Sequence, residues 1–312
     1  MNIPFTKFNN LGLAISGLLL ILSIAFISLR GLNFGLDFTG GISIEINYDE
    51  KVELEDIRTS LSNIEDANFV VLNFGSDDNI LIKFQSEDVE SFSPQTVFDQ
   101  LEVDNLLGEV TKTEVIFPQI GEELRDNGGI AILVAIFAIL VYIIFRFQYK
   151  FGIGAIAALV HDVLLILGLF SIFQLTFDLS VLAAVLAIVG YSLNDSIVVS
   201  DRIRENFLDQ NQKGSSDSLI NKSLNQVFAR TIITSFTTLL VLMALLIAGG
   251  AALTNFSLAL AVGVIIGSYS SIFIVVGVLL KMNLSNKDME KPKNDPEAVS
   301  YTHLTLPTRT RV

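Results

Sequence analysis

The sequence predicts a membrane protein in which six transmembrane helices are combined with one α+β domain, inserted between the first and second helices. Two observations support this fold class. Hydrophobic residues make up 51% of the 312 residues and the mean hydropathy is +0.58, which is too apolar for an ordinary soluble protein. The charge is unevenly spread, because residues 31–125 hold 21 of the 33 acidic residues and only 5 of the 20 basic residues. One acidic, soluble segment therefore interrupts an otherwise apolar chain.

The first predicted span is residues 8–29, which contain no charged side chain. At about 1.5 Å per residue this stretch crosses a hydrocarbon layer of about 30 Å. A cleavable signal peptide is the alternative, but the apolar run is too long for one and no small-x-small cleavage site precedes Arg30. A later run without charge is long enough for two helices joined near Gly249, Gly250 and Asn255. The other spans are residues 127–145, 151–174 and 179–200, and the last two share residues 231–280.

Basic residues in the short connections predict the orientation. Lys7, the pair Arg146 and Lys150, the segment 202–222 and Lys281 alternate with connections at 174–179 and 249–255 that contain no Lys or Arg. Because positive charge marks the cytoplasmic side, both termini are expected in the cytoplasm and residues 31–125 in the periplasm.

Residues 31–125 have the periodicity of an α+β fold. The stretch GISIEINY (41–48) alternates at period two, and apolar residues repeat at helical spacing over 54–64. NFVVLNF and NILIKFQ indicate two strands joined across residues 75–78, followed by a helix near 94–101 and a last strand at 109–117. The order β-α-β-β-α-β is that of the split βαβ, ferredoxin-like fold.

The chain thus divides into four parts: the N-terminus with the first helix (1–30), the periplasmic domain (31–125), five helices with a cytoplasmic segment at 201–229 (126–282), and a tail (283–312). Residues 283–297 are charged and contain proline, which is typical of disorder. Residues 298–312, AVSYTHLTLPTRTRV, change character abruptly and look like translated vector or adapter sequence.

Several kinds of chemistry have no support in the sequence. The chain has no cysteine, and its two histidines, His161 and His303, form no metal-binding cluster. It contains neither a Walker motif nor a catalytic Ser, His or Cys arrangement, and it has no basic footprint for nucleic acid. We therefore expect a protein that is not an enzyme, holds no metal and binds no nucleic acid.

A few ionisable residues lie within the predicted spans, where each costs about 3 kcal/mol at mid-bilayer. Asp162 follows His161 near the centre of the third span, Asp195 follows Asn194 deep in the fourth, and Arg230 opens the fifth. Since the fourth and fifth spans run in opposite directions, Asp195 and Arg230 are expected at comparable depth.

The fifth span also carries a predicted polar seam. Arg230 shares one helical face with Thr234, Thr237 and Thr238. A titratable carboxylate opposed to Arg and surrounded by hydroxyl groups is what a proton or ion pathway requires. A fixed ion pair that only locks two helices is the alternative. For Asp162 the alternative is an acid held by neighbouring hydroxyls or backbone.

Other polar or small residues in these spans have structural explanations. Asp201, Arg202, Arg204 and Glu205 are expected to form a solvated helix end. The residues Gly263, Gly267 and Ser271 of the last span fit helix packing of the small-xxx-small kind.

Two motifs carry a resemblance to a known family. FGLDFTGG (34–41), just after the first span, resembles the SecD/SecF signature FGIDFTGG, and VGYSLNDSIVVSDRIREN (189–206) resembles the SecF form VGYSxNDTIVVFDRIREN. The stretch ARTIITSFTTLL (229–240) is similar to the helix that follows in the family, and Asp162 lies in an AxxHDVxxxxG pattern typical of it. By its six spans and single insert the chain looks like SecF rather than a fused SecDF, within the RND superfamily.

The resemblance implies a subunit of the Sec translocon accessory complex in the bacterial inner membrane. Such complexes use the proton motive force to assist late steps of preprotein translocation. The implied partners are SecD, the SecYEG translocon, YajC as a further candidate, and the unfolded preprotein. No cofactor is implied beyond the proton gradient. Asp195 would be the proton-coupled carboxylate and Arg230 its partner.

The FGLDFTGG motif suits a hinge between the first span and the insert. Gly40 and Gly41 free the backbone, and Asp37 or Thr39 can hydrogen-bond a tight turn. A static turn explains the glycines equally well.

Two other functions are compatible with the sequence. An RND-type transporter half for small molecules or lipids would carry a larger insert lined by apolar and aromatic residues. A scaffold subunit that moves no protons would tolerate the substitution Asp195→Asn.

Overall fold

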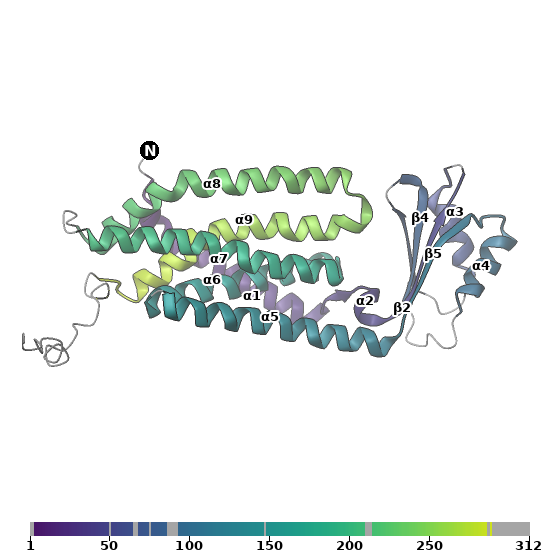
Figure 1. Cartoon of the computed structure of the whole chain (residues 1–312), viewed down its shortest axis with the longest axis horizontal. Helices are drawn as coiled ribbons and strands as arrows, with labels where there is room; N and C mark the ends of the chain where they lie inside the picture. Colours follow the sequence, from purple (N-terminus) through teal and green to yellow (C-terminus); the bar gives the residue numbers. More distant parts are fainter. Residues whose placement is uncertain are drawn as a thin grey trace, which may run out of the picture.

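A computed structural model describes residues 3–49, 51–64, 68–74, 76–85, 93–146, 148–209, 214–285 and 288. Six helices in it are long and apolar enough to span a membrane, which confirms the predicted number of spans. They are α1 (Phe5–Arg30), α5 (Pro118–Arg146), α6 (Tyr149–Phe173), α7 (Leu179–Leu208), α8 (Ser216–Ala248) and α9 (Gly250–Lys281). The start of α1 and the end of α9 lie at the same end of the bundle, and the α/β domain lies at the opposite end (Figure 1). The chain is therefore a multi-pass membrane protein with its inserted domain on one side.

Three of the helices extend by eight or more residues beyond the spans predicted for them. Helix α5 begins at Pro118 and so includes the charged stretch before residue 127, α7 continues to Leu208, and α8 begins at Ser216. The predicted cytoplasmic segment 201–229 is thus largely helical, because α7 and α8 extend beyond their apolar parts. Hydropathy identifies the part of each helix that crosses the membrane, but it does not show where the helix begins and ends.

The central helices of the bundle are α6, α7 and α9. Half or more of the apolar stretch of each is buried within the bundle, against less than a fifth for α1, α5 and α8. Small residues allow the close contacts: a Cβ at Gly263 would overlap Ile188, and one at Gly267 would press on Ser192. The predicted packing role of these glycines in the last span is observed at the α7–α9 interface.

The inserted domain contains β2 (Gly41–Asn47), α3 (Leu54–Leu61), β3 (Asn68–Phe74), β4 (Ser76–Gln85), α4 (Pro94–Val103) and β5 (Glu109–Ile116), in the predicted order. The four strands form an antiparallel sheet with the order β3-β4-β2-β5. Strand β4 begins at Ser76, earlier than predicted, and the Asp78 carbonyl accepts a hydrogen bond from the Tyr48 amide. The strand pairing therefore extends into the region where the sequence indicates a turn.

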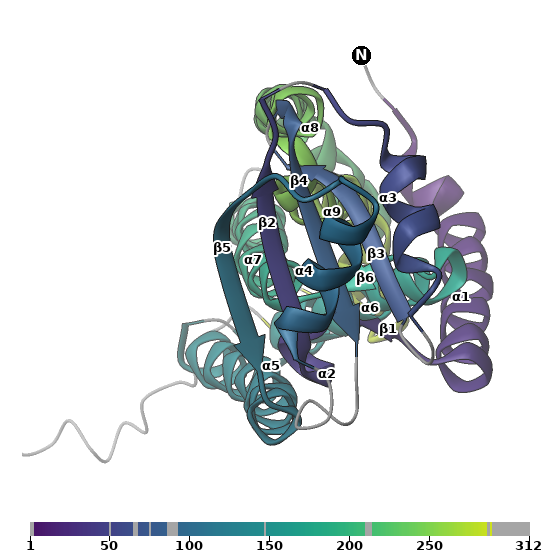
Figure 2. The same cartoon turned by 90° about the vertical axis from the view of Figure 1, so that its right-hand side faces the viewer.

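The sheet separates the two helices of the domain from the membrane bundle. Figure 2, viewed from the domain side, shows α3 and α4 in front of the sheet and the bundle behind it. The alternating residues Ile42, Ile44 and Ile46 of β2 are fully buried under these helices. Ser43 and Glu45 point to the other face, so the period-two pattern of the sequence separates the domain core from the surface that faces the bundle.

The tail is described only at residues 283–285 and 288. Asp288 forms an ion pair with Lys150 at 2.8 Å and accepts a hydrogen bond from the Ser285 amide. The remainder of 283–312, including the vector-like residues 298–312, lies outside the described residues.

Candidate functional site

Asp195 is buried between α7 and α9, with only 3% of its surface exposed. The Ser268 hydroxyl on α9 lies 3.5 Å from Asp195 Oδ2, and Ser268 also hydrogen-bonds Ser235 of α8 at 2.5 Å. The Tyr191 hydroxyl donates to Ser235 at 3.4 Å. A chain of hydroxyl groups therefore connects the Asp195 carboxylate to all three of the helices α7, α8 and α9.

Asn194 does not share this environment. Its side chain is exposed, because successive residues of a helix point about 100° apart and the next residue faces the bundle interior. Asn194 therefore lies outside the hydrogen-bonded cluster around Asp195, and its part in proton coupling stays a prediction.

Arg230 lies close to Asp195 but does not bond to it. Among the described residues no ion pair joins the two side chains, and the guanidinium acts on the carboxylate only as a nearby charge. Arg230 instead lines a pocket of about 360 Å³ between α7 and α8, together with Asp201, Arg202 and Glu205. The fixed ion pair considered for these helices is thus not formed in this structure.

The threonine seam predicted on α8 faces differently from the expectation. Thr237 is exposed, and the hydroxyls of Thr234, Thr237 and Thr238 donate to carbonyl groups of their own helix. The buried polar residues of α8 are Ser223, Thr231 and Ser235, and the last two lie beside the predicted seam. The buried stripe is displaced by one residue from the predicted face, because Leu242 packs against Val264 and thereby sets the rotation of the helix.

Asp162 forms a second buried cluster, and its residue is 1% exposed. Its Oδ2 accepts hydrogen bonds from Ser192 of α7 at 2.5 Å and from Ser270 of α9 at 2.7 Å. Its Oδ1 lies 2.8 Å from Nδ1 of His161, whose Nε2 is buried without a hydrogen-bond partner. The carboxylate is therefore held by two hydroxyl groups and one imidazole, and its part in proton coupling stays a prediction.

The two clusters are adjacent along both helices that they share. Ser192 lies one helical turn before Asp195 on α7, and Ser270 follows Ser268 by two residues on α9. A shift of α7 against α9 would consequently alter the hydrogen bonds of both carboxylates. No group of three His, Cys, Asp or Glu side chains suited to a metal ion occurs among the residues that the structure describes.

The FGLDFTGG motif lies at the junction of the bundle and the inserted domain. The motif begins in β1 (Asn33–Phe34), which pairs in parallel with β6 (Thr176–Phe177), and includes the short helix α2 (Leu36–Thr39). Asp37 Oδ2 accepts a hydrogen bond from the Leu179 amide at 2.9 Å, in the first turn of α7. Asp37 thus joins the motif to the helix that carries Asp195, whereas the sequence suggests a bond within its own turn.

Thr39, Gly40 and Gly41 form the tight turn that leads from α2 into strand β2. The Thr39 hydroxyl lies 3.2 Å from the carbonyl oxygens of Gly35 and Gly40. Gly40 and Gly41 have positive φ angles of 78° and 142°, and a Cβ at Gly41 would overlap the Phe84 carbonyl oxygen of β4. A Cβ at Gly40 would overlap the Pro118 backbone, so both positions combine a positive φ with no room for a side chain.

The sequence does not single out Ser235, Ser268 and Ser270, whose hydroxyl groups support the two acids together with Ser192. A serine costs little in an apolar helix and satisfies itself on its own backbone, so its presence does not stand out. The related pattern in the sequence is the four-residue spacing of Gly263, Gly267 and Ser271 on α9, which predicts close helix packing and not hydrogen bonds to an acid.

These observations define a class of protein: a multi-pass membrane protein that buries two carboxylates among hydroxyl groups of its central helices. Residues 100–285 match the family described as protein export membrane protein SecD/SecF, C-terminal, and residues 25–52 match the SecD/SecF GG motif. The chain belongs to the SecD/SecF family.

Relatives of this chain cover nearly its whole length. The protein translocase subunit SecF of Pseudomonas aeruginosa is 44% identical over 93% of this chain and 95% of its own. SecF of Haemophilus influenzae is 40% identical over 94% of this chain and 90% of its own. The crystal structure of SecDF, a translocon-associated membrane protein from Thermus thermophilus, is similar with a TM-score of 0.77 and 36% identity over 90% of this chain. The present chain spans 39% of that longer SecDF chain.

Proposed function

We propose that this chain is a SecF-type subunit of the Sec translocon accessory complex. It uses the proton motive force, together with a SecD partner, to assist late steps of preprotein translocation across the bacterial inner membrane. Relatives named as protein translocase subunit SecF, matched over nearly their whole length, support this proposal. Both termini are then cytoplasmic and the ferredoxin-like domain is periplasmic. The basic residues at helix ends favour that orientation: Lys7 at the start of α1, Lys150 at the start of α6, Arg202 near the end of α7 and Lys281 at the end of α9.

The proposed complex contains more than this chain. The match to the SecD/SecF family and the structural similarity to SecDF of Thermus thermophilus support SecD as a partner. SecYEG and YajC are the other proposed partners, the unfolded preprotein is the substrate, and the proton gradient takes the place of a cofactor.

The observation that carries the proposal is the burial of Asp195 among three helices, where no described basic side chain forms an ion pair with it. When charged, this carboxylate only accepts hydrogen bonds and attracts the nearby Arg230. When protonated, it also donates a hydrogen bond and no longer attracts the guanidinium. Proton binding therefore changes which arrangement of α7, α8 and α9 is favoured, as alternating conformations require.

Helix α7 offers a direct connection from Asp195 to the inserted domain. The first turn of α7 is bonded to Asp37, and the Gly35 amide donates to the Phe177 carbonyl at 2.8 Å just before that helix begins. From Gly41 the chain enters the central strand β2 of the sheet. A displacement of α7 would therefore be transmitted to the domain through the FGLDFTGG motif.

The experiment is export of a secreted reporter in cells that carry Asp195→Asn, with the amount of the variant in the membrane measured in parallel. Asn194→Ala is the matched control, because Asn194 adjoins Asp195 on α7 but is exposed. We expect export to fall strongly in Asp195→Asn and to remain normal in Asn194→Ala, while both variants still co-purify with SecD. Full export by a stable Asp195→Asn protein would instead identify a scaffold that moves no protons.

A further inference from the structure

Strand β3 is an edge of the sheet without the usual protection of an edge. Among the described strands it pairs only with β4. Its sequence, NFVVLNF, contains neither charge nor proline, and 51% of Val70 is exposed. Edge strands normally carry charged residues that prevent the addition of another strand. The opposite edge, β5, follows this rule with a Lys112–Glu114 ion pair of 2.7 Å.

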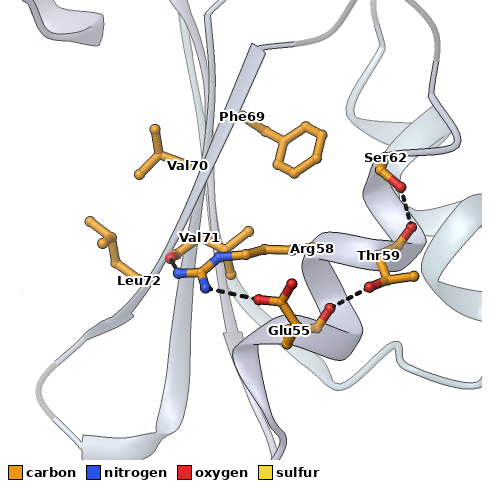
Figure 3. A pocket seen from close by; sticks show the side chains of 8 residues that line it. All are labelled: Glu55, Arg58, Thr59, Ser62, Phe69, Val70, Val71 and Leu72. Carbon is orange, nitrogen blue, oxygen red and sulfur yellow. Dashed lines mark hydrogen bonds and ion pairs between the residues drawn. The ribbon is translucent and has the colours of Figure 1, made fainter.

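A groove of about 450 Å³ separates β3 from α3. In Figure 3 the Arg58 side chain extends from α3 across this groove to the backbone of β3. Its Nη2 donates to the Val71 carbonyl at 3.1 Å, and its Nη1 donates to Glu55 at 3.3 Å. The carbonyl groups of a strand point alternately to its two sides. The Val71 carbonyl accepts from a side chain outside the sheet, so it lies on the side of β3 where an additional strand would pair. Arg58 therefore occupies a position that a strand N–H group would take.

Hollows lie on both faces of β3, so an additional strand has room for its side chains. On the helix side is the groove beside Phe69 and Val71. On the other side Val70 and Leu72 line a pocket of about 300 Å³ between the sheet and the bundle, which also includes Asp178 and Asn255. Side chains of an added strand would point alternately toward these two hollows.

We propose that β3 and α3 bind an extended, unfolded polypeptide segment by strand addition, and that Arg58 is a cover which the segment displaces. The occupant is identified by its chemistry: the edge offers main-chain donors and acceptors, and an extended chain of almost any sequence satisfies them. This inference rests on the proposed export function and assigns the surface that holds the substrate. Binding through main-chain groups suits a subunit whose substrates share no sequence.

The absence of cysteine from the chain makes a crosslinking test direct. Val70→Cys places a single thiol on β3, and Val115→Cys places one on β5, where the side chain is 40% exposed. Each full-length variant is tested in membranes with an export substrate that carries one cysteine and is arrested during translocation. We expect disulfide formation with the substrate several-fold more often at Val70→Cys than at Val115→Cys. We also expect Arg58→Ala, added to Val70→Cys, to increase that yield because the cover is removed.

Three outcomes decide between the possibilities. Equal yields at the two edges, or crosslinking of Val70→Cys to SecD instead of the substrate, would overturn strand addition of the substrate. A yield lowered by Arg58→Ala in a folded variant would overturn the role of Arg58 as a cover. Export by each variant is measured alongside Asp195→Asn: if export depends on Asp195 but the edges crosslink equally, only this inference fails.

Discussion

The hydrogen bond from the Leu179 amide to Asp37 predicts a measurable stability for the junction between motif and bundle. Asp37→Ala removes an acceptor 2.9 Å from an amide in the first turn of α7. Loss of a carboxylate that caps a helix costs about 0.5–2 kcal/mol, of which its favourable charge near the helix N-terminus supplies about 0.3–1 kcal/mol. Asp178 still accepts from the Val181 amide at 2.9 Å, so the helix start is weakened but not lost.

The assay is thermal unfolding of the purified protein in detergent, compared across two Asp37 variants and one control. Asp37→Asn keeps an oxygen acceptor without the charge, so we expect its midpoint to lie between those of the wild type and Asp37→Ala, which falls by a few degrees. Asp126→Ala removes an acid that is 75% exposed and should change nothing. If both Asp37 variants unfold like the wild type, the bond does not join the motif to α7 and the proposed transmission has no structural basis.

Two further predictions concern the inserted domain and its entry. Gly41→Ala should leave little folded protein, because the added Cβ overlaps the Phe84 carbonyl oxygen. Gly31→Ala, at a φ of 69° with open space around it, should lower the free energy of unfolding by only about 1–2 kcal/mol. Protein levels in the membrane and unfolding midpoints check both variants, and equal effects would contradict the clash at Gly41. Burial raises the pKa of Tyr48 to about 12, above an unfolded value of about 10, so its neutral hydroxyl, which donates to Leu106, stabilises the domain fully below pH of about 10 and loses this contribution as the pH rises toward 12. Unfolding of the whole protein between these pH values should show this loss in the wild type and not in Tyr48→Phe, and identical pH profiles would refute it.

The spans and the order of strands in the insert could be predicted from the sequence because each rests on a local, repeating pattern. A long uncharged run indicates a membrane span because its apolar residues favour the hydrocarbon layer. The alternation of Ile42, Ile44 and Ile46 indicates a strand with one buried face. The burial of Asp162 and Asp195 was predictable for the same reason, since a charge within such a run has to be enclosed by protein.

The parts that could not be predicted depend on contacts between distant segments. Asp37 bonds an amide 142 positions away, and Asn33 pairs with Thr176 in a parallel strand pair only two residues long. Neither contact leaves a periodic signal. The rotation of α8 about its axis likewise depends on how it packs against α9. The buried face of α8 is shifted by one residue from the predicted seam and therefore contains Ser235, which bonds Ser268 of α9.

The central claim is that Asp195 couples proton flow to export. It is tested most directly by completing translocation of an arrested reporter into inner-membrane vesicles with and without an imposed proton gradient. The account predicts that the gradient accelerates completion several-fold in wild-type vesicles and has no effect in vesicles with an equal amount of Asp195→Asn. Equal acceleration in both would contradict the account.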